Sequence, residues 1–255
     1  MTLVTVVIPI YKNRLSELER KSLSQACKVL HAYPIVIVKP EYLDVSAILQ
    51  EFPCLSVSSF DDSYFRGIEN YNRLMLSSQF YGRFLGSHYI LIYQLDAYVS
   101  RDELAVWCEK GYDYIGAPWL EKPVYRLPFV SVYMRLLHRY KIKRGILSKQ
   151  SLYNKVGNGG LSLRKVESHY KASIVCQETI DYYLAQKRSH FFYEDVFWAT
   201  EAPEFKYPDA MEALCFSFDK YPAYCYRLNG KQLPFGCHSW YKRKMKNFWR
   251  PIIGF

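Results

Sequence analysis

The chain has 255 residues, half of them hydrophobic and 23% charged, a composition that excludes an intrinsically disordered protein and suits one large α/β domain. The 34 Lys and Arg residues exceed the 24 Asp and Glu residues, so the net charge of +10 favours polyanionic partners: phosphates, anionic lipid or nucleic acid. Seven cysteines without a Cys-X-X-Cys pair argue against a disulfide framework and a zinc knuckle.

The first hundred residues alternate between strand and helix patterns. A continuous β-branched run at 3–11 predicts a central parallel strand, helical spacing follows over 15–30, and a second strand is expected at 35–38. This order predicts a βαβ unit with a right-handed crossover. A third strand is expected at 55–59, one longer helix at 68–85, and the most apolar strand at 89–93. Ser100 and Glu103 predict a capping box that opens a short helix, which Gly111 closes.

The second half of the chain is more irregular. Residues 118–155 contain prolines and a basic aromatic stretch, and a glycine-rich segment at 156–164 returns to extended structure. A helix is expected to start at Glu194, a strand at 213–218 and a Pro-Phe-Gly turn at 234–240. We therefore expect a nucleotide-binding half (1–115), a half that completes the site (116–241) and a basic aromatic tail (242–255). In open α/β sheets, the ligand site lies beyond the carboxyl ends of the strands.

Asp96 ends the most apolar strand in the sequence Gln94-Leu95-Asp96. A carboxylate at the carboxyl edge of a sheet is able to hold a hard divalent cation that also binds a diphosphate. A turn or helix-capping aspartate explains the residue equally well, and both interpretations stay open.

Three further segments have residues suited to chemistry. The glycines of VGNGGLSLR allow close approach of a ligand, or form a plain hairpin. Glu194 and Asp195 open an apolar helix, either as helix caps or as a general base and an acceptor-binding group, with apolar surroundings that raise a carboxyl pKa. His238, beside Trp240, is either structural or a second metal ligand with Asp96.

The order of these segments resembles GT-A-type glycosyltransferases. YILIYQLDAYV, YIGAPW, VGNGGLSLR, EDVFW and PFGCHSW together resemble an uncharacterised bacterial glycosyltransferase-like family over roughly residues 3–241. The resemblance implies a single-domain α/β protein with a GT-A-like, Rossmann-type mixed sheet flanked by helices. It also implies a UDP-linked nucleotide-sugar donor and a divalent metal, Mn²⁺ or Mg²⁺.

The resemblance also implies roles for individual residues. It places the Asp-X-Asp motif of the fold on Gln94 and Asp96, where Asp96 and the late His238 bind metal. Because Gln94 has no charge, a weaker metal affinity is expected. The acid pair implies Asp195 as base with Glu194 beside it. Donor contacts are expected from Pro9, Tyr11, Asn72, Arg73, Gln94, Asp96, Gly159, Gly160 and Arg164.

These expectations combine into one hypothesis: an inverting, metal-assisted glycosyltransferase that acts on a glycan or a lipid-linked saccharide in surface-polysaccharide assembly. Two alternatives stay open. A non-catalytic nucleic-acid-binding protein explains the charge but not the ordered acids, and no nucleic acid is expected as partner. A sugar-1-phosphate nucleotidyltransferase would share the fold, but VIPIYKNRLSE does not have its glycine- and lysine-rich signature.

The expected location is cytoplasmic, because the N-terminus has no signal-peptide pattern and no run approaches the roughly 20 apolar residues of a membrane span. The basic aromatic segments 242–255 and YMRLLHRYKIKR suit peripheral contact with the anionic inner face of a membrane. A solvated basic tail is the equal alternative for the C-terminus.

Overall fold

The computed structural model describes residues 1–186 and 190–255, and its centre is a six-stranded mixed sheet in the order β3-β2-β1-β4-β7-β6. Strands β3, β2, β1 and β4 are parallel, and β7 and β6 run antiparallel to their neighbours. A smaller sheet has the order β5-β9-β8. The strands are β1 (Thr2–Pro9), β2 (Ile35–Pro40), β3 (Leu55–Phe60), β4 (Ser87–Tyr93), β5 (Ala97–Val99), β6 (Tyr114–Ile115), β7 (Leu161–Lys165), β8 (Ser217–Phe218) and β9 (Gly236–His238).

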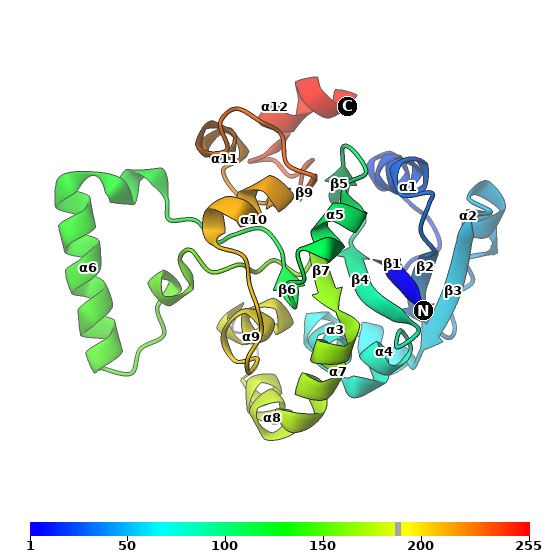
Figure 1. The fold of residues 1–255 in the computed structure, drawn as a ribbon, viewed down its shortest axis with the longest axis horizontal. Helices are drawn as coiled ribbons and strands as arrows, with labels where there is room; N and C mark the ends of the chain where they lie inside the picture. The colour runs from blue at the N-terminus through cyan, green and yellow to red at the C-terminus, as the bar shows by residue number, and fades with distance from the viewer. Residues whose placement is uncertain (187–189) are drawn as a thin grey trace.

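Helices cover both faces of the main sheet (Figure 1). Alternate residues of β1 point to opposite faces: Val6 and Ile8 pack beneath α1, α2 and α5, whereas Val7 packs with α3, α4 and α7. This arrangement confirms the predicted α/β class and the βαβ start, with β1 as a central parallel strand. The helices are α1 (Glu17–Val29), α2 (Ser46–Glu51), α3 (Ile68–Met75), α4 (Ser78–Gly82), α5 (Leu104–Glu109), α6 (Pro128–Lys143), α7 (Val166–Val175), α8 (Gln177–Ala185), α9 (Glu194–Thr200), α10 (Ala210–Phe216), α11 (Pro222–Leu228) and α12 (Lys246–Trp249).

Two sequence predictions about helices are wrong in detail. The single helix expected at 68–85 is two helices, because the Ser77 side chain caps α4 by accepting from the Phe80 amide at 3.1 Å. The segment expected as a strand at 213–218 is mostly α10, which Asp209 caps by accepting from the amides of Met211 and Glu212. Only Ser217–Phe218 is a strand.

The predicted capping box at Ser100 and Glu103 is also wrong. The Ser100 hydroxyl donates to the Pro234 carbonyl at 3.1 Å, and Asp102 accepts from the Leu104 amide where α5 begins. A capping box does form at Ser16 and Glu19, at the start of α1. The Ser100 hydroxyl thus makes a long-range contact with Pro234 instead of capping the helix that follows it.

The C-terminal residues pack against the domain. Trp249 and Ile253 are buried, and the Phe255 ring lies 4.6 Å from the ring of Trp240, centroid to centroid. α12 is followed by one turn of π-helix, Arg250–Gly254. Residues 242–255 are therefore a folded part of the structure rather than a solvated tail.

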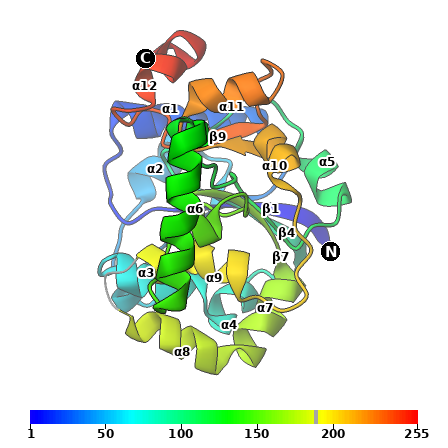
Figure 2. The ribbon, with the colours of Figure 1, turned by 90° about the vertical axis from the view of Figure 1, so that its left-hand side faces the viewer.

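Residues 122–149, called the arm below, project from the body of the molecule. Their main element is α6, which has no buried residue and stands away from the sheet in Figure 1, so that it faces the viewer in front of the body in Figure 2. No helix in the described part of the chain is both long and apolar enough to cross a membrane.

Candidate functional site

Asp96 lies just beyond the carboxyl end of β4, in a turn closed by a hydrogen bond from the Ala97 amide to the Gln94 carbonyl at 2.7 Å. One of its carboxylate oxygens is 3.0 Å from His238 Nε2, and the other is 2.8 Å from Lys242 Nζ. Burial raises the pKa of Asp96, but hydrogen bonds and charges from His238 and Lys242 outweigh burial and hold that pKa well below its usual range.

His238 ends β9 and lies between two acids. Its Nε2 faces Asp96, and its Nδ1 is 3.3 Å from an Asp219 oxygen. Burial lowers the pKa of His238, but the hydrogen bonds and charges of Asp219 and Asp96 raise it to about 9. The imidazole is therefore a cation near neutral pH, held between two carboxylates.

A first cavity of about 590 Å³ opens beside Asp96. It lies at the carboxyl ends of β1 and β4, the edge where α/β sheets bind ligands. The residues that line it include Pro9, Tyr11, Lys12, Tyr71, Gln94, Asp96, Tyr241 and Lys242. Four of the residues predicted to contact a donor, Pro9, Tyr11, Gln94 and Asp96, thus share one cavity.

The loop before β7 packs closely against both Glu194 and His238. A Cβ on Gly159 would collide with the Glu194 carboxylate, and a Cβ on Gly160 would collide with the imidazole of His238. The Gly160 carbonyl also accepts a hydrogen bond from the backbone amide of Gln94 at 2.8 Å. Glycine is required at both positions because the backbone itself contacts Glu194 and His238.

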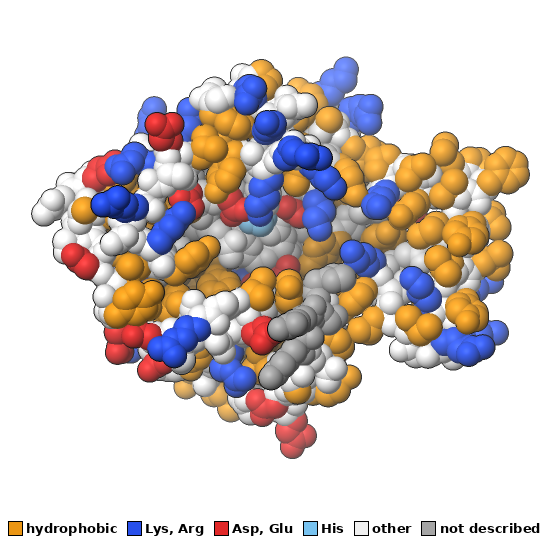
Figure 3. All heavy atoms as spheres, turned by 180° about the vertical axis from the view of Figure 1, so that it is seen from behind, with side chains coloured by type: hydrophobic (Ala, Val, Ile, Leu, Met, Phe, Trp, Pro, Cys, Tyr) orange, Lys and Arg blue, Asp and Glu red, His pale blue; other side chains and the backbone are white. Residues whose placement is uncertain are grey.

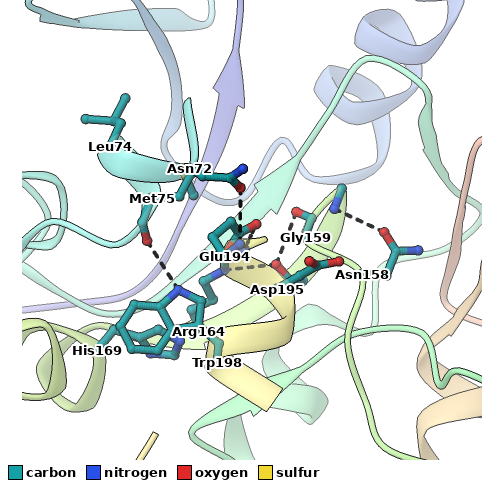
Figure 4. Close-up of polar contacts among 12 residues, drawn as sticks. Asn72, Leu74, Met75, Asn158, Gly159, Arg164, His169, Glu194, Asp195 and Trp198 are labelled. Atoms are coloured by element: carbon teal, nitrogen blue, oxygen red, sulfur yellow. Dashed lines mark hydrogen bonds and ion pairs between the residues drawn. The ribbon is translucent and has the colours of Figure 1, made fainter. Parts of the chain in front are cut away.

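Glu194 and Arg164 form a buried ion pair beneath this loop (Figure 4). Two guanidinium nitrogens of Arg164 lie 2.9 Å and 3.1 Å from the carboxylate oxygens of Glu194, and Tyr81 accepts from the same guanidinium. The Glu194 amide donates to the Asn72 side chain at 3.1 Å. These contacts anchor the first turn of α9.

Asp195, the next residue of α9, faces a second cavity of about 380 Å³. Burial raises the pKa of Asp195 and the charge of Glu194 adds to the rise, while Arg164 and backbone hydrogen bonds from Val196 and Gly159 partly offset it, so that the pKa is about 7. The cavity is also lined by Trp119, Lys122, Lys149, Tyr153, Tyr193, Asp219 and Tyr221.

The two cavities meet across His238. Asp96 lines the first cavity, Asp219 lines the second, and the imidazole of His238 contacts both carboxylates. Gly160 packs on that imidazole, while Gly159 packs on Glu194 beside Asp195. The tertiary structure thus brings together five segments distant in the sequence.

Five of the nine predicted donor contacts line neither cavity: Gly159 and Gly160 pack on Glu194 and His238, and the other three are Asn72, Arg73 and Arg164. Arg73 is exposed and lines neither cavity, and Asn72 is buried with its oxygen on the Glu194 amide. The side chain of Arg164 is fully buried against Glu194. Arg164 and Asn72 thus both contact Glu194 at the start of α9.

The sequence interpretation missed Asp219 and the place of Lys242. Asp219 directly follows the short strand β8, as Asp96 follows β4, so an acid after an apolar strand was the available signal. Lys242 appeared only as part of a basic tail, yet it donates to Asp96. A buried amide nitrogen, Nδ2 of Asn158, has no protein partner.

Asp96 and His238 provide two adjacent ligands of the kinds that Mn²⁺ or Mg²⁺ accepts, and Gln94 lines the same cavity. The described residues contain no group of three His, Cys, Asp or Glu side chains arranged to hold a metal. The residues therefore fit an ion that is completed by ligand oxygens, since Mg²⁺ is usually bound through one or two carboxylates and substrate phosphates.

The comparisons with known proteins agree with this architecture. Mouse xyloside xylosyltransferase 1 superposes with a TM-score of 0.55 at 14% identity, over 93% of this chain and 98% of that one. Galactosyltransferase LgtC, in complex with donor and acceptor sugar analogues, gives 0.54 at 12% identity, over 98% and 93% of the two chains. The glycosyltransferase GlyE of Streptococcus pneumoniae TIGR4 gives 0.54 at 12% identity, over 100% and 61%. The fold is that of GT-A glycosyltransferases.

At the level of sequence, residues 54–238 match the family described as "Protein of unknown function (DUF5672)". No match was found among curated proteins. The matched range runs from the segment before β3 to His238 and so includes both acids of α9.

Proposed function

Because the chain belongs to the DUF5672 family and has the GT-A fold, we propose that it transfers a sugar from a nucleotide-sugar donor to a saccharide acceptor. The observation that carries this proposal is the pair of cavities that meet across His238, one beside Asp96 and the other beside Asp195. A donor in the first cavity and an acceptor in the second would meet at this junction.

The first cavity suits a nucleoside diphosphate. Its rim holds Tyr11 and Tyr71, which offer aromatic surface to a base, and Gln94, whose amide suits a ribose hydroxyl. The ammonium of Lys242 lies at Asp96, where the diphosphate would be placed. We propose UDP as the nucleotide.

Asp96 and His238 would hold the divalent metal, Mn²⁺ or Mg²⁺, and His238 would bind it as the neutral imidazole, after release of its proton. When bound, such an ion neutralises charge on the leaving diphosphate. The chain itself supplies the Lys242 ammonium for the same charge, and its three N–H donors are able to reach phosphate oxygens.

Asp195 is the proposed general base. With a pKa of about 7, it is largely ionised just above neutral pH and still basic enough to accept a proton. It would take the proton from an acceptor hydroxyl as that oxygen attacks the anomeric carbon and the nucleoside diphosphate leaves, which inverts the anomeric configuration. Glu194 stays ion-paired to Arg164 and raises the pKa of Asp195 through its charge.

The second cavity suits an acceptor that combines sugar and phosphate. Trp119, Tyr153 and Tyr221 offer aromatic faces to a sugar ring, whereas Lys122 and Lys149 offer charge to an anion. A saccharide on a lipid diphosphate has both chemistries. We therefore propose a glycan or lipid-linked saccharide of surface-polysaccharide assembly as acceptor.

The test is a panel of nucleotide sugars incubated with the full chain and Mn²⁺, read out as release of nucleoside diphosphate. The wild type should hydrolyse one donor slowly without acceptor. Asp195→Asn should lower transfer by roughly 10²–10⁴-fold while UDP affinity is kept. The matched control is Asp181→Asn, which changes an exposed acid on α8. Transfer at the wild-type rate in Asp195→Asn would refute the assignment of the base.

A further inference from the structure

We propose that the arm, residues 122–149, docks on the surface of an anionic lipid bilayer; this inference rests on the proposed function, whose acceptor cavity the arm borders. The arm exposes its large apolar side chains, whereas the C-terminal segment packs on the body through two of its own. Trp249 and Ile253 of that segment are buried, and Lys242 pairs with Asp96.

The arm joins the body through the segments at its two ends, and the Arg126 guanidinium lies over the ring of Tyr224 on α11, 5.6 Å from its centroid. The Trp119 amide donates to the Lys155 carbonyl at 2.9 Å, and the Asn154 amide donates to the Trp119 carbonyl at 3.0 Å. Within the arm, α6 contacts the turn before it, Pro123–Arg126, and the returning segment, where Gln150 Nε2 donates to the Met134 carbonyl at 2.9 Å. The opposite side of α6 faces outward (Figure 2).

An apolar stripe runs along the outward side of α6. Five large side chains at spacings of three, one, three and four residues fall on one side of a helix, and each is between 49% and 91% exposed. They are Phe129, Val132, Tyr133, Leu136 and Tyr140. Arg135, Arg139 and Lys143 follow one another at intervals of four along one border of this stripe.

The positive charge of the protein is concentrated in the arm. Residues 122–149 contain eight Lys and Arg residues and no Asp or Glu, whereas the rest of the chain has 26 Lys and Arg against 24 Asp and Glu. Figure 3 shows the arm as a protrusion of orange and blue side chains. The net charge of +10 is thus mainly a property of 28 residues rather than of the whole surface.

An apolar stripe bordered by cations is complementary to an anionic bilayer. Apolar side chains enter the boundary between headgroups and acyl chains, while Lys and Arg stay at the anionic headgroups. The aliphatic side chains of Val132 and Leu136 offer nothing to a nucleic acid. A second arm would carry the same eight positive charges and no acid to pair with them.

Docking would bring the bilayer to the second cavity. Lys122 begins the arm and Lys149 ends it, and both line the cavity that Asp195 faces. A saccharide linked through phosphate to a membrane lipid would then reach Asp195 from the headgroup layer. Docking through the arm therefore favours a lipid-linked acceptor over a free glycan.

The experiment is flotation of the full chain with phosphatidylcholine vesicles that contain or omit phosphatidylglycerol. The wild type should float with the anionic vesicles and stay behind with the neutral ones. Val132→Ser with Leu136→Ser, and separately Arg135→Glu with Arg139→Glu, should each lower the bound fraction at least roughly tenfold. Because α6 has no buried residue, neither pair should change the melting temperature.

Two matched double variants are the controls. Ile174→Ser with Val175→Ser removes exposed apolar side chains from α7, and Arg14→Glu with Lys28→Glu reverses two exposed charges elsewhere; both should float like the wild type. Flotation that is absent in the wild type, or unchanged in the arm variants, would overturn the inference. So would a dimer in light scattering that Val132→Ser with Leu136→Ser converts to a monomer, or oligonucleotide binding that competes with the vesicles.

Nucleotide-sugar hydrolysis without vesicles separates this inference from the proposed function. Arm variants that keep hydrolysis but lose flotation support docking. A chain that floats through its arm but hydrolyses no donor would contradict the sugar-transfer proposal alone. A chain that hydrolyses a donor and does not float would contradict docking alone.

Discussion

Asp195 illustrates how one neighbour changes the chemistry of a side chain. It shares the first turn of α9 with Glu194, and burial together with the Glu194 charge raises its pKa to about 7. Glu194 is also buried, but Arg164 pairs with both of its carboxylate oxygens. Adjacent acids thus take different places, one facing a cavity and the other buried as an anchor.

The raised pKa of Asp195 predicts a pH dependence. A base must be deprotonated to accept a proton, so kcat/KM should be constant above about pH 7 and fall tenfold per pH unit below it. The measurement is a pH profile of donor consumption with saturating acceptor. Asp195→Glu serves as the conservative comparison, and a profile whose acid limb stays at the ordinary carboxyl pKa near 4 would contradict the assignment.

Lys242 provides a second test at this scale. Its ammonium lies 2.8 Å from Asp96 at the first cavity, so Lys242→Met should weaken binding of a nucleoside diphosphate by roughly 10–100-fold, the range of a charge-assisted hydrogen bond. A nucleoside without phosphates should bind equally to both proteins. Lys244→Met, which changes an exposed lysine two residues away, is the control for calorimetric titration.

The loop before β7 determines the site at the scale of elements. It connects β6 and β7 of the main sheet to the small sheet, because Gly160 packs on His238 of β9 while its carbonyl accepts from Gln94 after β4. Asn158, with a positive φ of 69°, turns the chain into this loop. The order of the strands in the main sheet would not by itself bring these segments together.

Gly159→Ala and Gly160→Ala should therefore abolish donor turnover. The added methyl groups would displace Glu194 and His238, respectively, and a small displacement of a catalytic group is costly. The melting temperature and donor hydrolysis should both fall. Gly86→Ala adds the same methyl group where no heavy atom lies within 4 Å and should change neither quantity.

At the scale of the whole molecule, the C-terminal segment and the arm have similar compositions but different positions in the structure. Both are basic and rich in aromatic residues, yet the segment packs on Trp240 and the arm stands free. The difference lies in the pattern: Trp249 and Ile253 fill a cluster with Phe218 and Cys225, whereas the α6 stripe meets no opposing surface in the described chain.

Deleting residues 245–255 should consequently destabilise the fold. Loss of buried Trp249 and Ile253 would cost about 3–6 kcal/mol in the free energy of unfolding, at about 1.5–3 kcal/mol for each large apolar side chain. Urea denaturation measures the change. An unaltered midpoint would mean that the segment is detached in solution, and Lys244→Ala, an exposed change beside it, should have no effect.

The sequence by itself determined the α/β class, the βαβ start, the apolar strand that precedes Asp96 and the helix that begins at Glu194. These features depend on local periodicity and capping, which neighbouring residues decide. It also indicated the candidate set Asp96, Asp195 and His238, through the order of its motifs.

Only the tertiary structure decided which side chains meet. Lys242 reaches Asp96, Asp219 reaches His238, and Arg164 turns inward to Glu194, all through contacts between residues far apart in the chain. The same holds for the division of basic segments into a packed C-terminus and a free arm. Long-range packing determines such placements, because burial and partner charges depend on the whole fold rather than on the residues nearby.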